Sequence, residues 1–531
     1  MASVVAGDAS GPAKAAAVAQ AAHPAGDRPH VVVDNPVILI VAIMLAALLQ
    51  ILDTTIANVA LPHMQSSLGA TSETITWVLT SYIIASAIAL PTTGWLAGRL
   101  GTRRLLLGSV SAFVILSMLC GMAVSLEEMV IFRVGQGVAG AFIVPLSQSV
   151  MLDVTRPSKH TQAMSIWGMG MMVGPIMGPI LGGWLTENLE WRWVFFVNIP
   201  IGALSLFLLA TQLSDWGREK VKFDRLGFIL IGVTLASTQL LLDRGLQIDW
   251  FDSNEAWIYI GLILAFGWAS VVHISTAKNP LFDRALFADR NFAVALLVMC
   301  IIGLNLYAIL ALLPPMLQHL FGYSVLETGL VLAPRGIGVL FSMPLSVYLA
   351  RKGVRNRVLV GGGFLITAIT MFEMSTWSLA VDSRHIVLTG LLQGAGTGMA
   401  FIPLNTLAFA TLTPRLRASA SSLLNLFRSI GSSIGISVAV SVLGRNIQVN
   451  HAELGQFVTA TTLPAVDLSA VSEIQPFGGA AVTLINAEVN RQAAMIAYVN
   501  DFYMMGIFCV LAIPLVLLIR SAKSGDGKAQ G

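Results

Sequence analysis

The segment PVILIVAIMLAALLQILDTTIANVAL, residues 36–61, is the first long apolar stretch of the chain. Its length suits an α-helix that crosses a bilayer, which needs about 20 apolar residues, and it is too long for the apolar region of a signal peptide. Asp53 places a carboxyl group inside this helix. Because ionisable residues within membrane helices are costly and usually functional, Asp53 is the first candidate functional residue.

The composition of the 531-residue chain indicates many membrane spans, since 56% of its residues are hydrophobic and only 11% are charged. An ordinary soluble domain is about 25% charged. We therefore expect an all-α membrane protein. Fourteen runs are long enough to span a bilayer, at about residues 36–61, 74–98, 104–124, 126–151, 161–186, 191–213, 225–243, 255–276, 291–321, 325–350, 357–377, 384–411, 416–445 and 500–520.

The lysines and arginines indicate the orientation of these helices. If the chain starts in the cytoplasm, 23 of the 31 Lys and Arg residues lie in inside segments, five lie in outside segments, and Arg133, Arg335 and Arg428 lie within the membrane. The positive-inside rule then predicts that both termini are cytoplasmic. Residues 1–35, rich in Ala, Gly and Pro, are predicted to form a disordered tail, and residues 521–531 form a second tail.

An internal repeat divides the chain into halves. QGVAGAFIVPLS, starting at Gln136, resembles QGAGTGMAFIPLN, starting at Gln393. The repeat predicts six-helix bundles over residues 36–213 and 291–520, with two extra helices and their linkers over 214–290. Two such halves with a site between them are typical of secondary transporters. The second half includes a long outside segment, residues 446–499, which is either a solvated loop or a docking surface for a partner protein. Its end, from about Thr483 to Tyr498, is a candidate amphipathic helix.

The sequence lacks the motifs that are typical of several functional classes. No GxxxxGK[ST] phosphate loop occurs, the histidines show no metal-binding spacing, and three cysteines in separate apolar runs suggest neither a disulfide framework nor a metal site. Nothing indicates enzyme chemistry, a cofactor or nucleic-acid binding. We expect the energy for transport to come from an ion gradient.

The fifth helix carries glycines at four-residue intervals in GMGMMVGPIMGPILGGWL, which starts at Gly168. Such a stripe allows another helix to approach closely, and prolines within it permit bending. Either tight packing or a flexing interface explains the pattern. Its residues are Gly170, Gly174, Pro175, Gly178, Pro179, Gly182 and Gly183. A second motif, GWLAGRLGTRR, follows the second helix, and its glycines and arginines are Gly94, Arg99, Gly101, Arg103 and Arg104; alone, it is a basic anchor.

These segments together resemble a known family. LDTTIANVALP, GWLAGRLGTRR, IFRVGQGVAGAFIVP and GPIMGPILGG are similar to the signature motifs of the major facilitator superfamily, over about residues 36–520. The helix count and LDTTIANVALP resemble its fourteen-helix drug/proton antiporter family of the EmrB/QacA type, and EmrB-type members most. One departure is Gly98, where the superfamily usually has Asp, so a cytoplasmic gate built on that residue is not expected here.

The resemblance implies a major facilitator fold and proton-driven multidrug efflux across the bacterial inner membrane. It implies that Asp53 and Arg133 take part in proton coupling and that the region around Gly174 and Pro175 is the antiporter motif. It also implies an EmrA-like periplasmic adaptor and an outer-membrane channel as partners, with residues 446–499 as the candidate contact.

The positions of Asp53 and Arg133 along their helices predict a contact. Asp53 lies about 12 Å from the outer end of its helix and Arg133 about 10 Å from the outer start of its own, at 1.5 Å per residue. Buried ionisable groups usually pair, so we expect the two to interact directly or through water. A structural ion pair is the alternative. Gly390 stands at the position of Arg133 in the repeat, so symmetric packing does not require an arginine there.

The remaining embedded charges leave the membrane region net positive, which favours neutral or anionic substrates over dications. Arg335 and Arg428 are also able to serve as structural caps. Polar, aromatic and charged residues are expected to line a substrate cavity, with core packing as the alternative for each: Asn58, Trp77, Tyr82, Gln136, Asn305, Tyr307, Arg335, Glu373, Gln393, Asn405 and Arg428.

The favoured function is proton-driven export of hydrophobic toxic compounds by alternating access. A proton-linked exporter of an endogenous lipid or metabolite fits the same residues. A membrane sensor or scaffold would also have fourteen helices, but it would not need a depth-matched Asp53 and Arg133.

Overall fold

A computed structural model describes residues 29–31, 33–71, 74–214, 222–248, 250–457 and 478–519. Most of the expected tail over residues 1–35, and all of that over 521–531, lie outside these ranges. The described residues form helices and no strands, and fourteen of the helices are long and apolar enough to cross a membrane. This count confirms the expectation from the sequence.

The first half contains six spans, several of them built from more than one helical element. Their elements are α2 (Pro36–Ser67), α3 (Trp77–Ala89) with η1 (Leu90–Thr92) and α4 (Thr93–Leu100), α5 (Thr102–Met122), α6 (Leu126–Gly140) with α7 (Ile143–Asp153), η2 (Pro157–Lys159) with α8 (His160–Asn188), and α9 (Trp193–Phe196) with α10 (Asn198–Gln212).

Two extra spans and the second half follow. The extra spans are α11 (Arg225–Arg244) and α12 (Asn254–Thr276), joined through η3 (Trp250–Asp252). The second half comprises α13 (Arg284–Ala288), α14 (Arg290–Phe321), α15 (Val325–Arg351), α16 (Asn356–Met374), α17 (Ser383–Phe409), η4 (Pro414–Leu416), α18 (Arg417–Gly455) and α20 (Gly478–Leu517).

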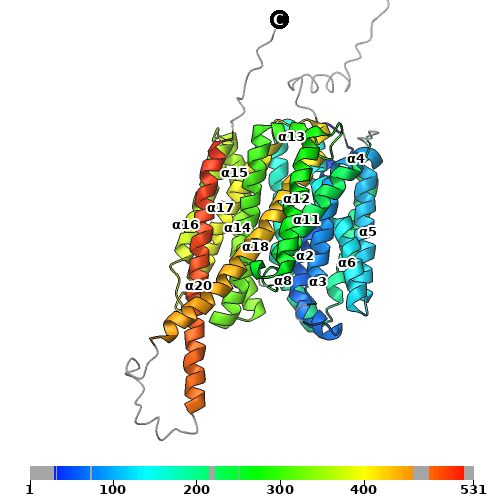
Figure 1. The fold of residues 1–531 in the computed structure, drawn as a ribbon. Helices are drawn as coiled ribbons and strands as arrows, with labels where there is room; N and C mark the ends of the chain where they lie inside the picture. The colour runs from blue at the N-terminus through cyan, green and yellow to red at the C-terminus, as the bar shows by residue number, and fades with distance from the viewer. Residues whose placement is uncertain are drawn as a thin grey trace, which may run out of the picture.

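The two ends of the bundle differ in shape. We call the end that holds Pro36 and Leu517 the tail face and the opposite end the far face. Figure 1 shows α18 and α20 extending past the rest of the bundle at the far face. The two extensions are tied together, because Asn450 Nδ2 donates to Ala493 O at 3.3 Å and the His451 ring bonds Asn486.

These extensions correct the expected boundaries of the last two helices. The sequence placed residues 446–499 in one outside segment, with a candidate helix over about residues 483–498. In the structure α18 continues to Gly455, and α20 begins at Gly478 and includes that candidate helix. Polar residues are compatible with a helix that leaves the membrane, so apolar length alone did not reveal these ends. Residues 458–477 lie outside the described part of the chain.

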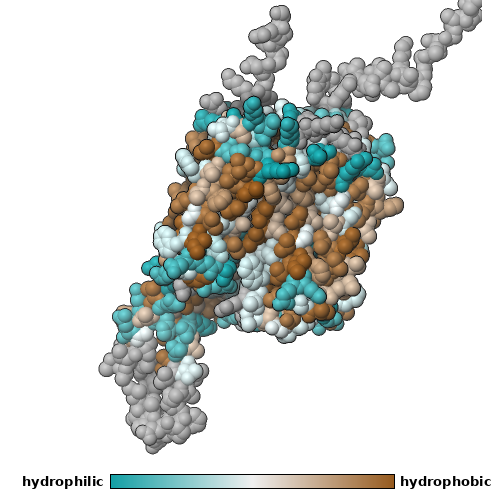
Figure 2. Space-filling model, turned by 45° about the vertical axis from the view of Figure 1, so that its right-hand side comes forward, coloured by the Kyte–Doolittle hydropathy of each residue, from teal (hydrophilic) through white to brown (hydrophobic). Residues whose placement is uncertain are grey.

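The extra helices lie against the outside of the two halves. α11 packs on α3, on α18 and on α12, and Gln239 Nε2 of α11 donates to Ser433 Oγ of α18 at 2.8 Å. Only 6% of the most apolar window of α12 is buried, which is expected for a helix that faces lipid. Figure 2 shows one side of the molecule, with hydrophobic residues in a band between more polar ends.

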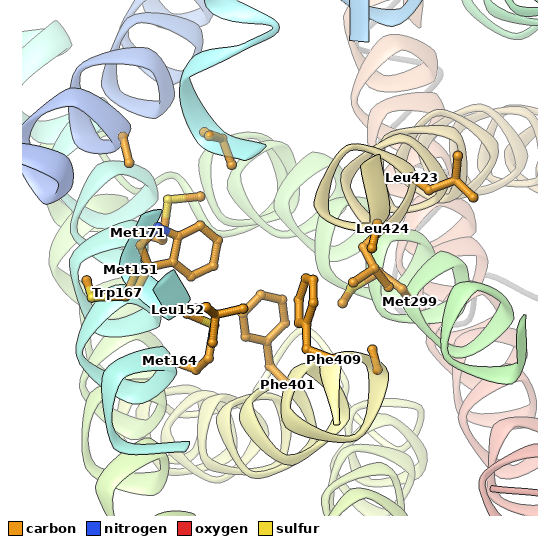
Figure 3. Packing of buried hydrophobic residues seen from close by; sticks show 14 of the residues in the cluster. Met151, Leu152, Met164, Trp167, Met171, Met299, Phe401, Phe409, Leu423 and Leu424 are labelled. Atoms are coloured by element: carbon orange, nitrogen blue, oxygen red, sulfur yellow. The ribbon is translucent and has the colours of Figure 1, made fainter. Parts of the chain in front are cut away.

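The two halves share one apolar core near the tail face. Figure 3 shows Leu152 of α7 and Trp167 of α8 from the first half close to Phe401 and Phe409 of α17 from the second. All four side chains are buried. Burial of such large apolar groups favours association of the halves at this end.

Candidate functional site

Asp53 of α2 and Arg133 of α6 form a direct ion pair in the first half. Arg133 Nη1 donates to Asp53 Oδ2 at 2.7 Å, and both side chains are fully buried. The contact expected from their matched depths is therefore present. Because removing charges from water is costly, such a pair is favoured where hydrogen bonds satisfy most of its other polar atoms.

Amide side chains occupy the second oxygen of Asp53. Gln136 Nε2 donates to Oδ1 at 2.9 Å, and Asn198 Nδ2 donates to the same atom at 2.7 Å. Asn198 Nδ2 also lies 2.9 Å from Ser117 Oγ, whose hydroxyl donates to Phe195 O. Hydrogen bonds from three side chains thus stabilise the ionised carboxylate.

Arg133 is held by groups other than Asp53 as well. Its Nε donates to Val78 O at 3.0 Å, and its Nη1 also donates to Gln136 Oε1 at 2.8 Å. The guanidinium lies 4.4 Å from the centroid of the Tyr82 ring, whose hydroxyl accepts a hydrogen bond from Gln50. Nη2 of Arg133 has no partner among the described residues. The cluster is neutral overall, and a proton on Asp53 would leave Arg133 as an unbalanced buried cation.

The glycine stripe of α8 packs against the helix that carries Asp53. A Cβ atom on Gly174 would lie 2.5 Å from Ile51, and one on Gly178 would lie 2.1 Å from Thr55 Oγ1. A Cβ atom on Gly170 would lie 2.5 Å from Met44, and one on Gly182 would lie 3.2 Å from Ile56. The stripe therefore covers α2 on both sides of Asp53, and close approach of the two helices requires glycine.

Polar side chains join the halves near the tail face. Gln148, which directly follows the first copy of the repeat, donates to Asn405 Oδ1, in the last residue of the second copy, at 2.8 Å. Ser421 Oγ of α18 donates to Gln148 Oε1. Arg417 Nη1 lies 2.6 Å from Asp153 Oδ1, and these two side chains are 10% and 8% exposed. Opening of the tail face must break these bonds.

We expect Asp153→Asn to favour states that are open at the tail face. The substitution removes the charge that balances Arg417, and a hydrogen bond to a charged group contributes about 1.5–3 kcal/mol, or roughly ten- to hundredfold in population. Spin labels at the exposed positions Ser158 and Lys352, on opposite halves, should show a longer distance. Glu190→Gln, which breaks the exposed Glu190–Arg192 pair, should not change it. Identical distances in Asp153→Asn and the native chain would contradict the expectation.

The loop motif after the second span, GWLAGRLGTRR, also lies at the tail face. Gly101 has a φ of 91°, which favours glycine, and a Cβ atom on Gly94 would lie 1.9 Å from Ser419 Oγ of α18. Arg103 donates to Ala210 O at 2.8 Å, and Arg99 lies over the Trp95 ring. Gly98 carries no charge, and among the described residues Asp153 and Arg417 form an ion pair between the halves at this face.

Four of the residues predicted to line the substrate cavity are buried among partners inside the bundle. Tyr82 and Gln136 belong to the Asp53 cluster, and Asn405 lies in the contact between the halves. Gln393, the repeat counterpart of Gln136, contacts the sulfur atoms of Met371 and Met374. Polar partners inside the bundle explain the burial of the first three.

The other predicted residues are spread over both halves. Asn58 is exposed on α2, and Trp77 lies 5.9 Å from the Arg244 guanidinium. Glu373 accepts hydrogen bonds from Trp377 and Thr389. Tyr307 and Arg428 are half-buried, whereas Asn305 and Arg335 line a small cavity.

Sequence reasoning missed several polar residues at these sites. Asn198 and Ser117 complete the Asp53 cluster, while Gln148, Asp153 and Arg417 join the halves. Asn198 begins α10 immediately after an apolar run, which gives no period or motif to mark it. Asp153 lies two residues beyond the span predicted over about residues 126–151, so its position predicted a loop residue.

Comparisons with known proteins all point to the same family. A family model of the Major Facilitator Superfamily matches residues 43–436. Multidrug export protein EmrB of Haemophilus influenzae is 38% identical over 428 residues, covering 80% of this chain and 83% of that protein. Fatty acid resistance protein FarB of Neisseria gonorrhoeae is 34% identical, covering 91% and 96%. The solved proton:xylose symporter XylE has a TM-score of 0.57 at 15% identity, covering 90% and 94%, which shows likeness of fold.

Proposed function

Because the chain belongs to the major facilitator superfamily, we propose that this multi-pass membrane transporter exports hydrophobic toxic compounds in exchange for protons. The export of drugs by its EmrB relative supports the substrate class. No cofactor would be needed, since the proton gradient would supply the energy. The observation that carries the proposal is the fully buried pair of Asp53 and Arg133 on two helices of one half.

The geometry suggests how a proton would change the structure. Protonation of Asp53 Oδ2 would remove the negative charge that Arg133 now contacts at 2.7 Å. Arg133 would then form hydrogen bonds with other groups. α2 would be free to shift along the glycine stripe of α8, because glycine lets the two helices slide past each other at close distance. In this scheme, loading and release of the proton accompany closing and opening of the tail-face bonds around Asp153 and Arg417.

We place the transporter in the bacterial inner membrane, with the tail face in the cytoplasm. The positive-inside bias supports this orientation. The far face would then be periplasmic, and the paired extensions of α18 and α20 would project there. These extensions are the candidate contact for an EmrA-like adaptor, which would in turn join an outer-membrane channel.

Drug-induced proton movement tests the proposal. The purified chain in liposomes, with an imposed proton gradient, should accumulate a hydrophobic drug, and addition of drug to protein in detergent should release protons. A sensor or scaffold would do neither. Absence of both signals for a panel of hydrophobic drugs would refute the proposal.

Export of an endogenous lipid or metabolite is the second candidate. The fatty-acid-resistance relative supports the lipid part of this candidate, because its name associates a related chain with an amphipathic acid. The same liposome assay, run with fatty acids beside drugs, separates the two substrate classes.

A further inference from the structure

A small cavity lies inside the second half, among α14, α15, α16 and α17. Its volume is about 20 Å³, and its polar lining consists of Asn305, Arg335, Thr367 and Thr397. Arg335 is 7% exposed and Asn305 is 5% exposed. A cavity of this size holds about one water molecule, and the rest of its lining is apolar. Thr397 is partly exposed, so the cavity wall is not sealed on every side.

The polar groups in this cavity are not satisfied by the chain. Arg335 Nη2 and Asn305 Oδ1 have no hydrogen-bond partner among the described residues, although Asn305 Nδ2 donates to Ile301 O. The hydroxyl groups of Thr367 and Thr397 donate to backbone carbonyls. Neither hydroxyl is therefore left to donate, and the guanidinium of Arg335 is left without an anion.

The buried arginines of the two halves differ in their partners. Arg133 is balanced by Asp53 at 2.7 Å, whereas no ion pair of Arg335 is found in the described part of the chain. Glu373 is already bonded to Trp377 and Thr389. Because a buried cation without a partner is unfavourable, an anion that binds from outside the chain would be stabilised beside Arg335.

We propose that Arg335 and Asn305 form a subsite for the carboxylate of an amphipathic anionic substrate. This inference rests on the proposed transport function and narrows its substrate class. The carboxylate would replace water beside Arg335 Nη2, while the apolar tail would lie along Leu306, Ile309 and Phe364 of the lining. The side chains at the cavity edge must move to admit the tail. A neutral ester of the same chain length would lack the charge-assisted hydrogen bond.

Equilibrium binding to the full chain tests the subsite. The chain is placed in phosphatidylcholine nanodiscs, which offer no anionic headgroup, and the probes are decanoate and methyl decanoate at neutral pH. Arg335→Gln should weaken decanoate binding about 10- to 100-fold, the range for loss of a hydrogen bond to a charged group, and leave ester binding unchanged. Arg335→Lys, which keeps the charge, should retain part of the preference for the acid.

Arg445→Gln is the matched control. Arg445 is an exposed arginine of α18, so its loss changes the charge of the second half by the same amount without touching the cavity. Its substitution should leave the preference for decanoate intact. Equal binding of acid and ester by the native chain would mean that the cavity holds only water and would overturn the proposal. So would an equal loss in Arg335→Gln and Arg445→Gln. Because the assay needs no gradient, its result is independent of whether protons are exchanged.

Discussion

Asp53→Asn is expected to abolish the exchange of drug for protons. An asparagine side chain cannot take up or release a proton. It also cannot reproduce the contacts of the carboxylate, because Asp53 accepts from Arg133 on one oxygen and from Gln136 and Asn198 on the other. Whichever way the amide turns, its NH₂ group faces other donors. Drug-driven proton flux in liposomes should fall to the rate of liposomes without protein.

Glu255→Gln is the control for this substitution. Glu255 also pairs with an arginine, Arg244, but the pair lies on α11 and α12, and both side chains are about one-third exposed. Its loss should change the flux little, as exposed pairs contribute little. If Asp53→Asn exchanged drug for protons at the native rate, the role of Asp53 would be only structural.

Arg133→Gln is expected to cause the largest loss of stability. It leaves the fully buried Asp53 without its cation, and removal of one partner of a buried pair costs about 3–5 kcal/mol. The contacts of Arg133 with Val78 O and the Tyr82 ring are lost as well. Thermal unfolding of the purified chain in detergent should show a clear decrease in Tm.

The double variant Asp53→Asn/Arg133→Gln separates charge imbalance from lost packing. It contains no unpaired charge at this position, so it should be more stable than Arg133→Gln alone. A double variant that is less stable than Arg133→Gln would indicate that the guanidinium supports the bundle mainly by packing.

The number of helices and the central ion pair were predictable from the sequence. Apolar length reports membrane spans directly, because lipid leaves the backbone no other partners. The pair was predictable because each residue was the exceptional charge in its helix, and a rise of 1.5 Å per residue converts position into depth. The structure confirms both, at fourteen spans and at a 2.7 Å contact.

Other parts of the site depend on contacts that the sequence does not encode locally. Asn198 is 145 positions from Asp53, and Arg417 is 264 positions from Asp153, so only the packing of helices brings them together. The far end of α18 was missed because its residues are polar, whereas the helix expected over about residues 483–498 is part of α20. That Arg335 Nη2 has no hydrogen-bond partner among the described residues is likewise visible only in the packed structure.

The position of α11 makes the two sides of the bundle different. On one side α11 contacts both α3 of the first half and α18 of the second, and it bonds Ser433 through Gln239, so it bridges the two halves there. On another side α8 of the first half packs directly on α15 of the second. A compound dissolved in the bilayer therefore meets an asymmetric protein, in which an added helix joins the halves at one contact and the halves meet directly at the other.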